Sequence, residues 1–475
     1  MEKRTETFAE EMREQLGFPP DLIVRAVETS NREGVLLYLD GMVDGKELED
    51  SFLLPMLRRN APFENSFSGI LGVVSYSGTL REIGEKECAK SLAKGNAIFA
   101  CETLRLEIGA KKPTERSVSE PPTSSVIKGP REGFVESLKT NVVLLRKRLK
   151  TPELVLKEKM LGEKTNSRIV MAYIKGVADE KIAEDMEKKL SEVKIDGILD
   201  SSYISKILED KPYSLFKQIG NSEKPDVITN KLLDGKIAVL CEGSPIALYA
   251  PFALIEDFED VQDAYKRPLR ATFLRYVRLL GAFLALLLPA AFVAVQVYQF
   301  QLLPVELLST VINSTGKIPF SPMLEMLIAL LLFEILGEAS IRMPRHIGLA
   351  LGVVGAIVLG ETAVNAGILS SLTVLVVAMS GIGIYSVPDE AGTLSVLRVL
   401  FVVFSGLLGL IGLLFFGMAI LAYLSNMSCF GIPYLLPVAP IFKEDLKDIL
   451  IKRNLTDVKE RFASFSLKNK KRLEE

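Results

Sequence analysis

Tryptophan is absent from this chain of 475 residues, and histidine and cysteine are scarce. A single histidine, His346, and four cysteines without a CxxC pair do not form a four-ligand zinc site of normal spacing. The cysteines are better interpreted as small buried hydrophobes in a reducing compartment. We therefore expect neither a metal nor another cofactor.

The sequence signatures of common enzyme sites are missing as well. There is no Walker A sequence, no GxGxxG after a strand, no HExxH and no GxSxG. The net charge of −2 gives no overall basic field that would attract nucleic acid. The first 17 residues carry charges but no apolar core, so no cleaved signal peptide is expected. We predict a protein that is not an enzyme, binds no nucleic acid and keeps its soluble part in the cytoplasm.

Apolar and charged residues are segregated along the chain. The mean hydropathy is +0.27 although 24% of the residues are charged. The stretch from Val399 to Ser425 has no charge, and the other apolar segments also follow residue 270. The first 270 residues contain no comparable run. The sequence therefore predicts an α/β cytoplasmic region followed by an α-helical transmembrane bundle.

We expect five parts in chain order. They are a cytoplasmic α/β subdomain (1–115), a connector and helix (116–150), a second α/β subdomain (151–265), a transmembrane bundle of about four to five helices (266–427) and a charged cytoplasmic tail (428–475). The connector is assigned from its proline, serine and charge content.

The two α/β subdomains resemble each other. Each begins with a strand-like apolar run, followed by glycine and then by an amphipathic helical pattern. Asp44 in the first and Asp179 in the second stand at matching places, where a carboxylate would cap a helix N-terminus. The matching positions predict the same helix start in both subdomains.

A second correspondence follows, because residues 91–110 align with residues 231–250 without a gap. The matched residues are Gly95 and Gly235, Cys101 and Cys241, and Glu102 and Glu242. The two glycines are expected to turn strand hairpins that require positive φ. We interpret the soluble region as a duplication, with a strand, a helix and paired strands in each copy.

A helix is predicted from near Glu132 to Lys150, with an apolar and a basic face. The basic face consists of Arg146, Lys147, Arg148 and Lys150. Two interpretations stay open for it: a solvated surface, or a contact with an anionic membrane surface or a partner.

The first membrane span is expected at about residues 271–298. Five basic residues lie in the segment from Lys266 to Arg278, whereas the exit loop, 299–320, contains a single basic residue, Lys317. The positive-inside rule therefore places the N-terminal region in the cytoplasm.

The next apolar segment, 321–341, contains three glutamates. Glu334, Glu338 and Arg342 are spaced by four residues and share one helical face, whereas Glu325 falls on another. Carboxylates at membrane depth must face protein or water. Two interpretations stay open: a helix held to its neighbours by a Glu–Arg pair, or a helix that lines a cation pathway.

Two further apolar segments, 346–363 and 369–387, follow, with Glu361 at the turn between them. The last segment, about 394–424, contains four glycines that are expected to serve helix packing, with a glycine hinge as the alternative. Glu334, Glu338, Arg342 and Glu361 are the candidates for a pore or for an intramembrane polar face.

The number of crossings conflicts with the charge pattern. Five spans would place the two termini on opposite sides of the membrane. The basic tail after Lys443, however, favours the cytoplasm for both ends. We therefore expect that one of the middle segments does not cross completely.

Five stretches resemble the A subunits of GerA-type bacterial spore germination receptors. They are residues 116–154, 194–204, 242–278, 333–370 and 430–440, with GPREGF and RPLRATFLR as the most specific motifs. The resemblance implies a role in nutrient-triggered germination at the spore inner membrane. It also implies multiple spans, an N-terminal domain that faces the spore core, and no catalytic residues. The segment EDFED, with Asp257 and Asp260, is more acidic than the aromatic-rich version typical of the family, which argues against its lying in the membrane surface.

The resemblance further implies partners. In this family the A subunit works with a transporter-like B subunit, which binds the germinant, and with a lipoprotein C subunit. A subunits oligomerise into an ion-conducting channel surrounded by lipid. The main hypothesis is therefore a channel-forming receptor subunit, and the alternatives are a non-conducting scaffold that docks partner subunits and a secondary transporter. The absence of a repeat within residues 271–425 disfavours the transporter.

Overall fold

The computed structural model describes residues 2–29, 32–58, 66–74, 76, 78–112, 129–316, 318–342, 355, 357–442, 445, 451, 452, 461 and 471. Some sequence features considered above lie outside these residues. They are much of the expected connector, Lys317, His346, the first part of the apolar segment 346–363 and most of the tail after residue 442.

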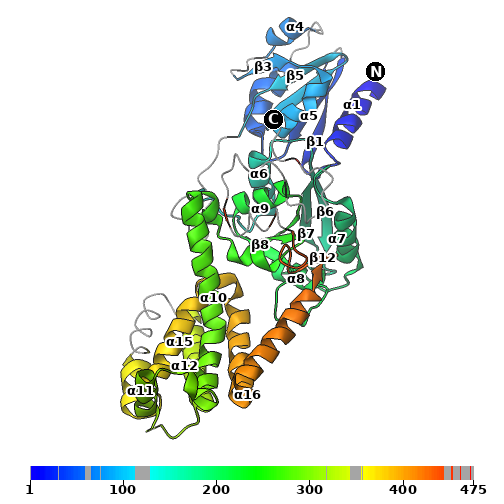
Figure 1. The fold of residues 1–475 in the computed structure, drawn as a ribbon. Helices are drawn as coiled ribbons and strands as arrows, with labels where there is room; N and C mark the ends of the chain where they lie inside the picture. The colour runs from blue at the N-terminus through cyan, green and yellow to red at the C-terminus, as the bar shows by residue number, and fades with distance from the viewer. Residues whose placement is uncertain are drawn as a thin grey trace.

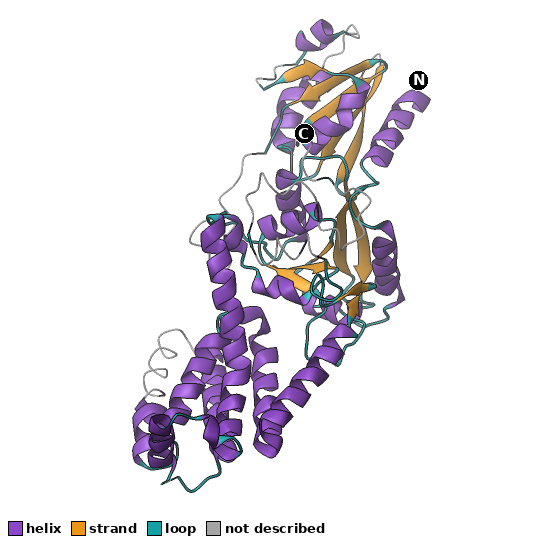
Figure 2. Ribbon diagram, in the orientation of Figure 1, coloured by secondary structure: helices purple, strands orange, loops and turns teal. Residues whose placement is uncertain are grey.

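The first subdomain, residues 2–112, is built on a five-stranded antiparallel sheet of order β1-β2-β4-β5-β3 (Figures 1 and 2). Its elements are α1 (Glu2–Gln15), β1 (Leu22–Thr29), β2 (Arg32–Leu39), α2 (Gly45–Leu48), η1 (Glu49–Leu53), α3 (Leu54–Arg58), α4 (Phe67–Leu71), β3 (Leu80–Glu82), α5 (Glu85–Ala93), β4 (Ala97–Cys101) and β5 (Leu104–Ile108). Successive residues of β2 point to opposite faces, so Leu36 packs with Phe52 while Leu37 packs with Met12 of α1. Both faces of the sheet are therefore covered.

The second subdomain, residues 151–250, has the same strand order, β6-β7-β9-β10-β8. Its elements are β6 (Leu154–Leu161), β7 (Ser167–Ile174), α7 (Glu180–Glu192), α8 (Ser201–Leu208), β8 (Gly220–Ser222), α9 (Pro225–Leu233), β9 (Ile237–Cys241) and β10 (Ala247–Ala250). Helix α7 buries Ile182, Met186 and Leu190, which are spaced by four residues and therefore share one face.

The residues matched in the sequence occupy equivalent places in the two sheets. Asp44 follows β2 and precedes α2, and Asp179 follows β7 and precedes α7. Cys101 ends β4, and Cys241 ends β9. The α/β architecture of the soluble region is thus confirmed, and the shared strand order supports its interpretation as a duplication.

The predicted role of Gly95 and Gly235 is wrong in one respect. Both have positive φ, 84° and 87°, but they end helices α5 and α9 and do not turn strand hairpins. The residues before each glycine continue a helix, so the glycine takes the left-handed position that commonly follows a helix C-terminus. The hairpin turn lies further on, where Glu102 has a φ of 49° between β4 and β5.

Helix α6 (Leu138–Arg148) joins the two subdomains, and it is shorter than the predicted helix. Ser137 caps it, because the Ser137 hydroxyl accepts a hydrogen bond from the Thr140 amide. Val143 enters the core of the first subdomain, whereas Leu145 enters that of the second. Arg146 is not on a solvated face: it is buried and binds Asp21 with two hydrogen bonds of 2.5 and 2.7 Å.

The remaining described elements form a joint, a set of helices and a short hairpin. We call residues 251–267 the joint; it contains η2 (Leu254–Phe258) and η3 (Val261–Ala264). The helices are α10 (Pro268–Val297), η4 (Phe300–Leu302), α11 (Val305–Thr315), α12 (Pro322–Arg342), η5 (Val358–Thr362), α14 (Ala363–Asn365), α15 (Ser371–Ile384), η6 (Pro388–Glu390) and α16 (Ala391–Ser425), and the hairpin pairs β11 (Ser428–Cys429) with β12 (Ile432–Pro433). The helical region lies below the second subdomain in Figure 1.

Helix α16 reverses its direction at Gly409, which has a φ of 65° and a ψ of −148°. At its start, the Thr393 hydroxyl donates to the carbonyl of Leu215 at 2.9 Å. Near its end, the ring of Tyr423 lies 6.3 Å from that of Phe216. A straight helix between Thr393 and Tyr423 would be about 45 Å long, so both ends reach the same loop only because the helix folds back. Gly409 therefore makes a turn within the last segment, in agreement with the alternative of a glycine hinge.

Two further differences concern the membrane segments. The expected exit loop contains η4 and α11, and no residue of α11 is buried. Helix α15 has 14 residues, which span about 21 Å and fall short of a hydrocarbon core of ~30 Å. This length agrees with the expectation that one middle segment crosses incompletely.

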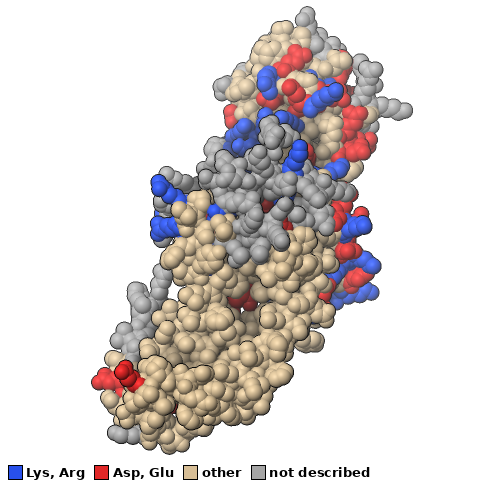
Figure 3. All heavy atoms as spheres, in the orientation of Figure 1, with Lys and Arg blue, Asp and Glu red and all other residues tan. Residues whose placement is uncertain are grey.

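Among the described residues, two stretches are long and apolar enough to cross a membrane, Pro268–Val297 and Pro388–Ser425. The second is the folded α16 together with η6. In Figure 3 the charged side chains gather on the soluble subdomains, and the helical region below presents a surface almost without them.

Candidate functional site

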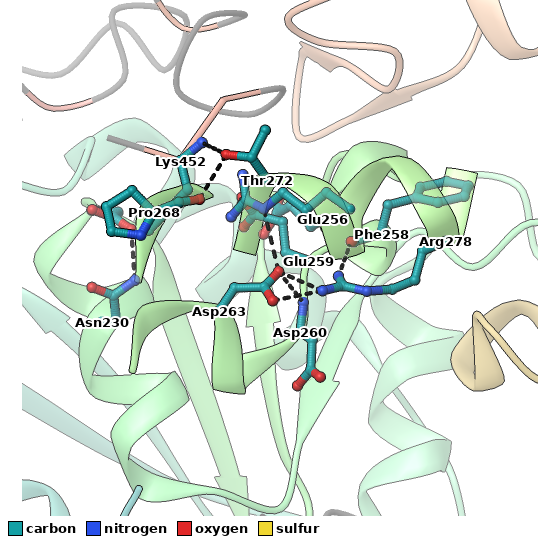
Figure 4. A network of polar contacts seen from close by, with 12 residues as sticks. Asn230, Glu256, Phe258, Glu259, Asp260, Asp263, Pro268, Thr272, Arg278 and Lys452 are labelled. Atoms are coloured by element: carbon teal, nitrogen blue, oxygen red, sulfur yellow. Dashed lines mark hydrogen bonds and ion pairs between the residues drawn. The ribbon is translucent and has the colours of Figure 1, made fainter. Parts of the chain in front are cut away.

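Ion pairs fasten the start of α10 to the joint (Figure 4). The carboxylate of Asp263, in η3, is buried and accepts hydrogen bonds from Arg278 at 2.6 and 2.7 Å and from Arg275 at 3.3 Å. Arg275 also binds Glu259 at 3.0 Å, and Arg278 donates to the carbonyl of Phe258. Two of the basic residues that precede the first span are therefore held in a network within the chain.

A second buried network lies beside the first. The carboxylate of Glu256, in η2, binds Lys231 of α9 at 2.5 Å and also binds Lys236. Burial works to raise the pKa of Glu256, but the two ammonium groups outweigh it and lower the pKa to about 2. The joint is thus tied to the second subdomain by charges that persist at neutral pH.

A cavity of about 630 Å³ opens between the joint and the second subdomain. Its lining includes Asp226, Tyr249, Asp257, Asp263 and Lys452. Lys452, from the chain's tail, lies against α10, because its amide donates to the Thr272 hydroxyl at 3.0 Å. The cavity therefore lies where the second subdomain, the joint, the first long helix and the tail meet.

A polar cluster is enclosed among the helices. We call the parts of α16 before and after Gly409 its first and second arms. Arg398, in the first arm, is completely buried and binds Glu334 of α12 at 2.6 Å. It also donates to the Ser380 hydroxyl of α15 at 2.9 Å, and Ser380 in turn donates to the carbonyl of Ala285 in α10 at 2.7 Å. Four helices are linked through these contacts, so the cluster fixes their mutual arrangement.

Glu325 has a structural partner of its own. Its side chain is buried, and its carboxylate accepts a hydrogen bond of 2.6 Å from the amide of Ser370, which caps α15. The glutamate at the start of α12 therefore holds the start of α15.

Among the described residues, no group of three His, Cys, Asp or Glu side chains could hold a metal ion. The four cysteines are buried and free of disulfides. Burial raises the pKa of Cys241 to about 11, which leaves its thiol protonated and weakly reactive.

The sequence matches a known protein family along most of its length. The profile described as "Bacillus/Clostridium GerA spore germination protein" matches residues 10–464, nearly the whole chain. The chain belongs to the GerA family.

The relatives of this GerA-family chain match along most of their length. Spore germination protein KA of Bacillus subtilis (strain 168) is 31% identical over 451 residues, which cover 93% of this chain and 83% of the relative. Spore germination protein GerLA of Bacillus cereus is 31% identical over 463 residues, covering 95% and 93%. Uncharacterized membrane protein YfkQ of Bacillus subtilis (strain 168) is 33% identical over 438 residues, covering 91% and 85%. The predicted resemblance to germination receptor A subunits is confirmed.

One solved structure is also similar. It is the crystal structure of the N-terminal domain of the A subunit of the Bacillus megaterium spore germinant receptor GerK3. The match covers 51% of this GerA-family chain and 92% of the solved chain, with 25% identity and a TM-score of 0.41.

The residues predicted for a polar face in this GerA-family chain lie apart. Glu338 and Arg342 form an ion pair of 2.6 Å whose side chains are 61% and 78% exposed. Glu334 is turned into the cluster with Arg398. Glu361 lies in η5 and is exposed. The four residues therefore form two ion-paired sites and one separate carboxylate.

The two predicted cap residues of the duplication lie at helix starts. Asp44 accepts hydrogen bonds of 3.1 and 3.2 Å from the amides of Lys46 and Glu47. Asp179 accepts one of 3.0 Å from the amide of Lys181. These contacts satisfy amides that have no partner within the helix.

Arg398 and Glu390 were missed by the sequence analysis. Both lie just before the charge-free run that begins at Val399, and Glu390 is buried at the start of α16. An arginine that begins an apolar segment is itself a signal, because a charge at membrane depth needs a partner. The partner, Glu334, could have been sought among the three glutamates of α12.

Proposed function

We propose that this chain is the channel-forming A subunit of a nutrient-sensing germinant receptor. It assembles with further copies of itself, with a transporter-like B subunit and with a lipoprotein C subunit in the lipid of the spore inner membrane. Its opening lets monovalent cations leave the spore core. The soluble subdomains face the cytoplasm or spore core, and the chain crosses the membrane several times.

The observation that carries the channel proposal is the exposed charge on the helical region. Glu338, Arg342 and Glu361 are exposed on the single chain, although charged side chains at membrane depth must face protein or water. Further copies of the chain that enclose a watery path would give these groups such surroundings.

The charged residues of the helical region differ in how strongly they would attract a cation. Glu334 and Glu338 are each neutralised by an arginine of the same chain. Glu361 forms no ion pair within the described part of the chain. A ring of Glu361 carboxylates would attract cations and repel anions, whereas the Glu334–Arg398 pair would hold the helices that surround the path.

The folded helix α16 supports a topology with both termini on one side. The segment after it, residues 426–442, binds the second subdomain: the Tyr434 hydroxyl donates to the carbonyl of Lys217 at 2.7 Å, and the Cys429 thiol donates to that of Gln218. The tail then starts on the side of the soluble subdomains, in agreement with its basic character.

The test is ion flux from vesicles that contain the chain, alone and with its B and C subunits. We expect cation efflux that is unaffected by Glu338→Asp and reduced several-fold by Glu361→Gln, with equal amounts of assembled protein. Absence of flux in every combination would favour the scaffold. Saturable flux coupled to uptake of a solute would favour the transporter.

A further inference from the structure

Three segments that are distant in the sequence meet around two buried carboxyl groups. Asp257 belongs to the joint, Glu390 starts α16, and Lys217 lies in the loop before β8 of the second subdomain. The Asp257 side chain is 3% exposed and Glu390 is 4% exposed. These groups are thus removed from water at the place where the soluble region meets the helices.

The hydrogen bonds of this cluster are incomplete without a proton. Lys217 binds one oxygen of Asp257 at 2.5 Å. The other oxygen, Oδ2, has no donor among the described residues, and Glu390 lies within hydrogen-bond reach of the Asp257 carboxyl. Two ionised carboxylates can only accept, so the contact between them requires one shared proton.

We propose that Asp257 and Glu390 form a proton-binding site that holds α16 against the second subdomain. With the proton in place, one carboxyl donates to the other, and the single remaining negative charge is balanced by Lys217. Loss of the proton leaves two buried negative charges facing one ammonium group. The contact then opens, because the repulsion and the loss of hydration are relieved only by separation.

No other nearby group supplies the missing hydrogen bond within the described residues. The phenol of Tyr434 lies near both acids, but its hydroxyl donates to the carbonyl of Lys217. Tyr249, from β10, is also close. Glu256, next to Asp257, is occupied by Lys231 and Lys236. The balance of charge at the site therefore depends on the one proton.

Protons can reach the site through the cavity of about 630 Å³, because Asp257 belongs to its lining. Asp389, beside Glu390, also belongs to the lining. A change in the pH of the compartment that contains the soluble subdomains is thus transmitted to the buried pair.

The site is placed to act on both arms of α16. The loop that carries Lys217 also carries Leu215, which accepts from Thr393 in the first arm, and Phe216, which packs against Tyr423 in the second. A shift of this loop away from Asp257 therefore changes the contact of the second subdomain with both arms.

The pH at which this occurs lies in an accessible range. Burial and the neighbouring Glu390 carboxyl raise the pKa of Asp257 to about 8, although the Lys217 ammonium works to lower it. A carboxyl whose pKa is raised by folding stabilises the closed joint while it is protonated. That stabilisation is present at low pH and is lost as the pH rises through about 8.

The experiment is disulfide cross-linking between Leu215→Cys and Thr393→Cys in membranes that contain the full chain, between pH 7 and pH 9. The matched control carries Asp257→Asn as well. In that variant the amide oxygen still accepts from Lys217 and the amide N–H still donates to Glu390, without titration. We expect the cross-linking yield of wild type, relative to the control, to fall by about ninefold from pH 7 to pH 9. Over this interval the protonated fraction of Asp257 falls from about 0.9 to ~0.1.

The comparison with Asp257→Asn removes the pH dependence of the thiol chemistry itself. If the ratio of the cross-linking yields of wild type and Asp257→Asn were the same at pH 7 and at pH 9, the proposal would be overturned. If Asp257→Asn does not fold, Glu390→Gln takes its place, because its amide also donates without a proton. A wild type and Glu390→Gln with the same pH profile would again contradict the proposal. The cross-linking yield does not depend on ion flux. Its result therefore tests the proton site independently of the proposed channel.

Discussion

Arg398 shows how one residue connects several helices of this receptor subunit. Its guanidinium is fully buried, with Glu334 and Ser380 as partners and the Phe333 ring 5.5 Å away. The Glu334 side chain is 40% exposed, so removing Glu334 leaves the buried Arg398 charge uncompensated, which costs more than the pair itself contributes. The cluster is therefore most sensitive to truncation of Glu334, the partner of the buried charge.

Glu334→Met should lower the stability of the helical region by about 3–5 kcal/mol, because the fully buried Arg398 then loses its counter-charge within the protein. The matched control is Arg342→Met, which removes an exposed partner of Glu338 and should cost about 1 kcal/mol or less. Thermal unfolding in detergent, followed by size-exclusion chromatography, measures the two changes. Equal losses in both variants would show that burial of Arg398 does not matter.

The sequence could predict the polar residues of the helices but not their partners. Glu334, Glu338 and Arg342 share a helical face, so a Glu–Arg pair was one open interpretation, and Glu338 does pair with Arg342. Glu334 instead pairs with Arg398, which is 64 positions away in the sequence. Local periodicity shows which face a residue occupies, whereas the helix that packs on that face is set by the tertiary fold.

Helix α16 illustrates the same limit at the scale of an element. The run from Val399 to Ser425 has no charge and no proline, and its glycines look alike in the sequence. Only Gly409 takes a conformation, φ 65° and ψ −148°, that side chains other than hydrogen avoid. Phe401 and Phe416, on the two arms, then pack with ring centres 4.7 Å apart.

Gly409→Ala should destabilise the turn of α16 by about 1–3 kcal/mol, because an alanine is strained in this conformation. Its Cβ would also lie 3.0 Å from the side chains of Tyr298 and Gln299. Gly417→Ala is the control, since its Cβ meets only Phe401 at 3.8 Å. The unfolding temperature of each variant in detergent measures the effect. Equal unfolding temperatures of Gly409→Ala and Gly417→Ala would contradict this prediction.

The duplication was the feature of the whole molecule that the sequence predicted best. Apolar runs and matched residues such as Cys101 and Cys241 depend on local pattern, and each sheet repeats the pattern in the same strand order. The error at Gly95 arose because helix ends and hairpin turns both favour glycine with positive φ. The joint was less predictable, because Asp257 and Glu390 are brought together by the packing of distant segments.

The position of the two ends relative to the membrane is the last property of the whole molecule that can be tested. Helix α10 is 30 residues long and spans about 45 Å, so α11 lies on the side opposite to the soluble subdomains if α10 crosses. Residues 426–442 bind the second subdomain and should lie on the same side as it does.

Single cysteines at Ile312, in α11, and at Val438, after α16, test this arrangement, because both side chains are exposed and the native cysteines are buried. The sealed vesicles are those whose interior contains the soluble subdomains. A membrane-impermeant thiol reagent added outside should then label Ile312→Cys and leave Val438→Cys unlabelled until the vesicles are opened. Labelling of both from outside would require an even number of crossings between α11 and residue 438. It would also break the contact between residues 426–442 and the second subdomain, on which the proposed coupling of α16 to the soluble region depends.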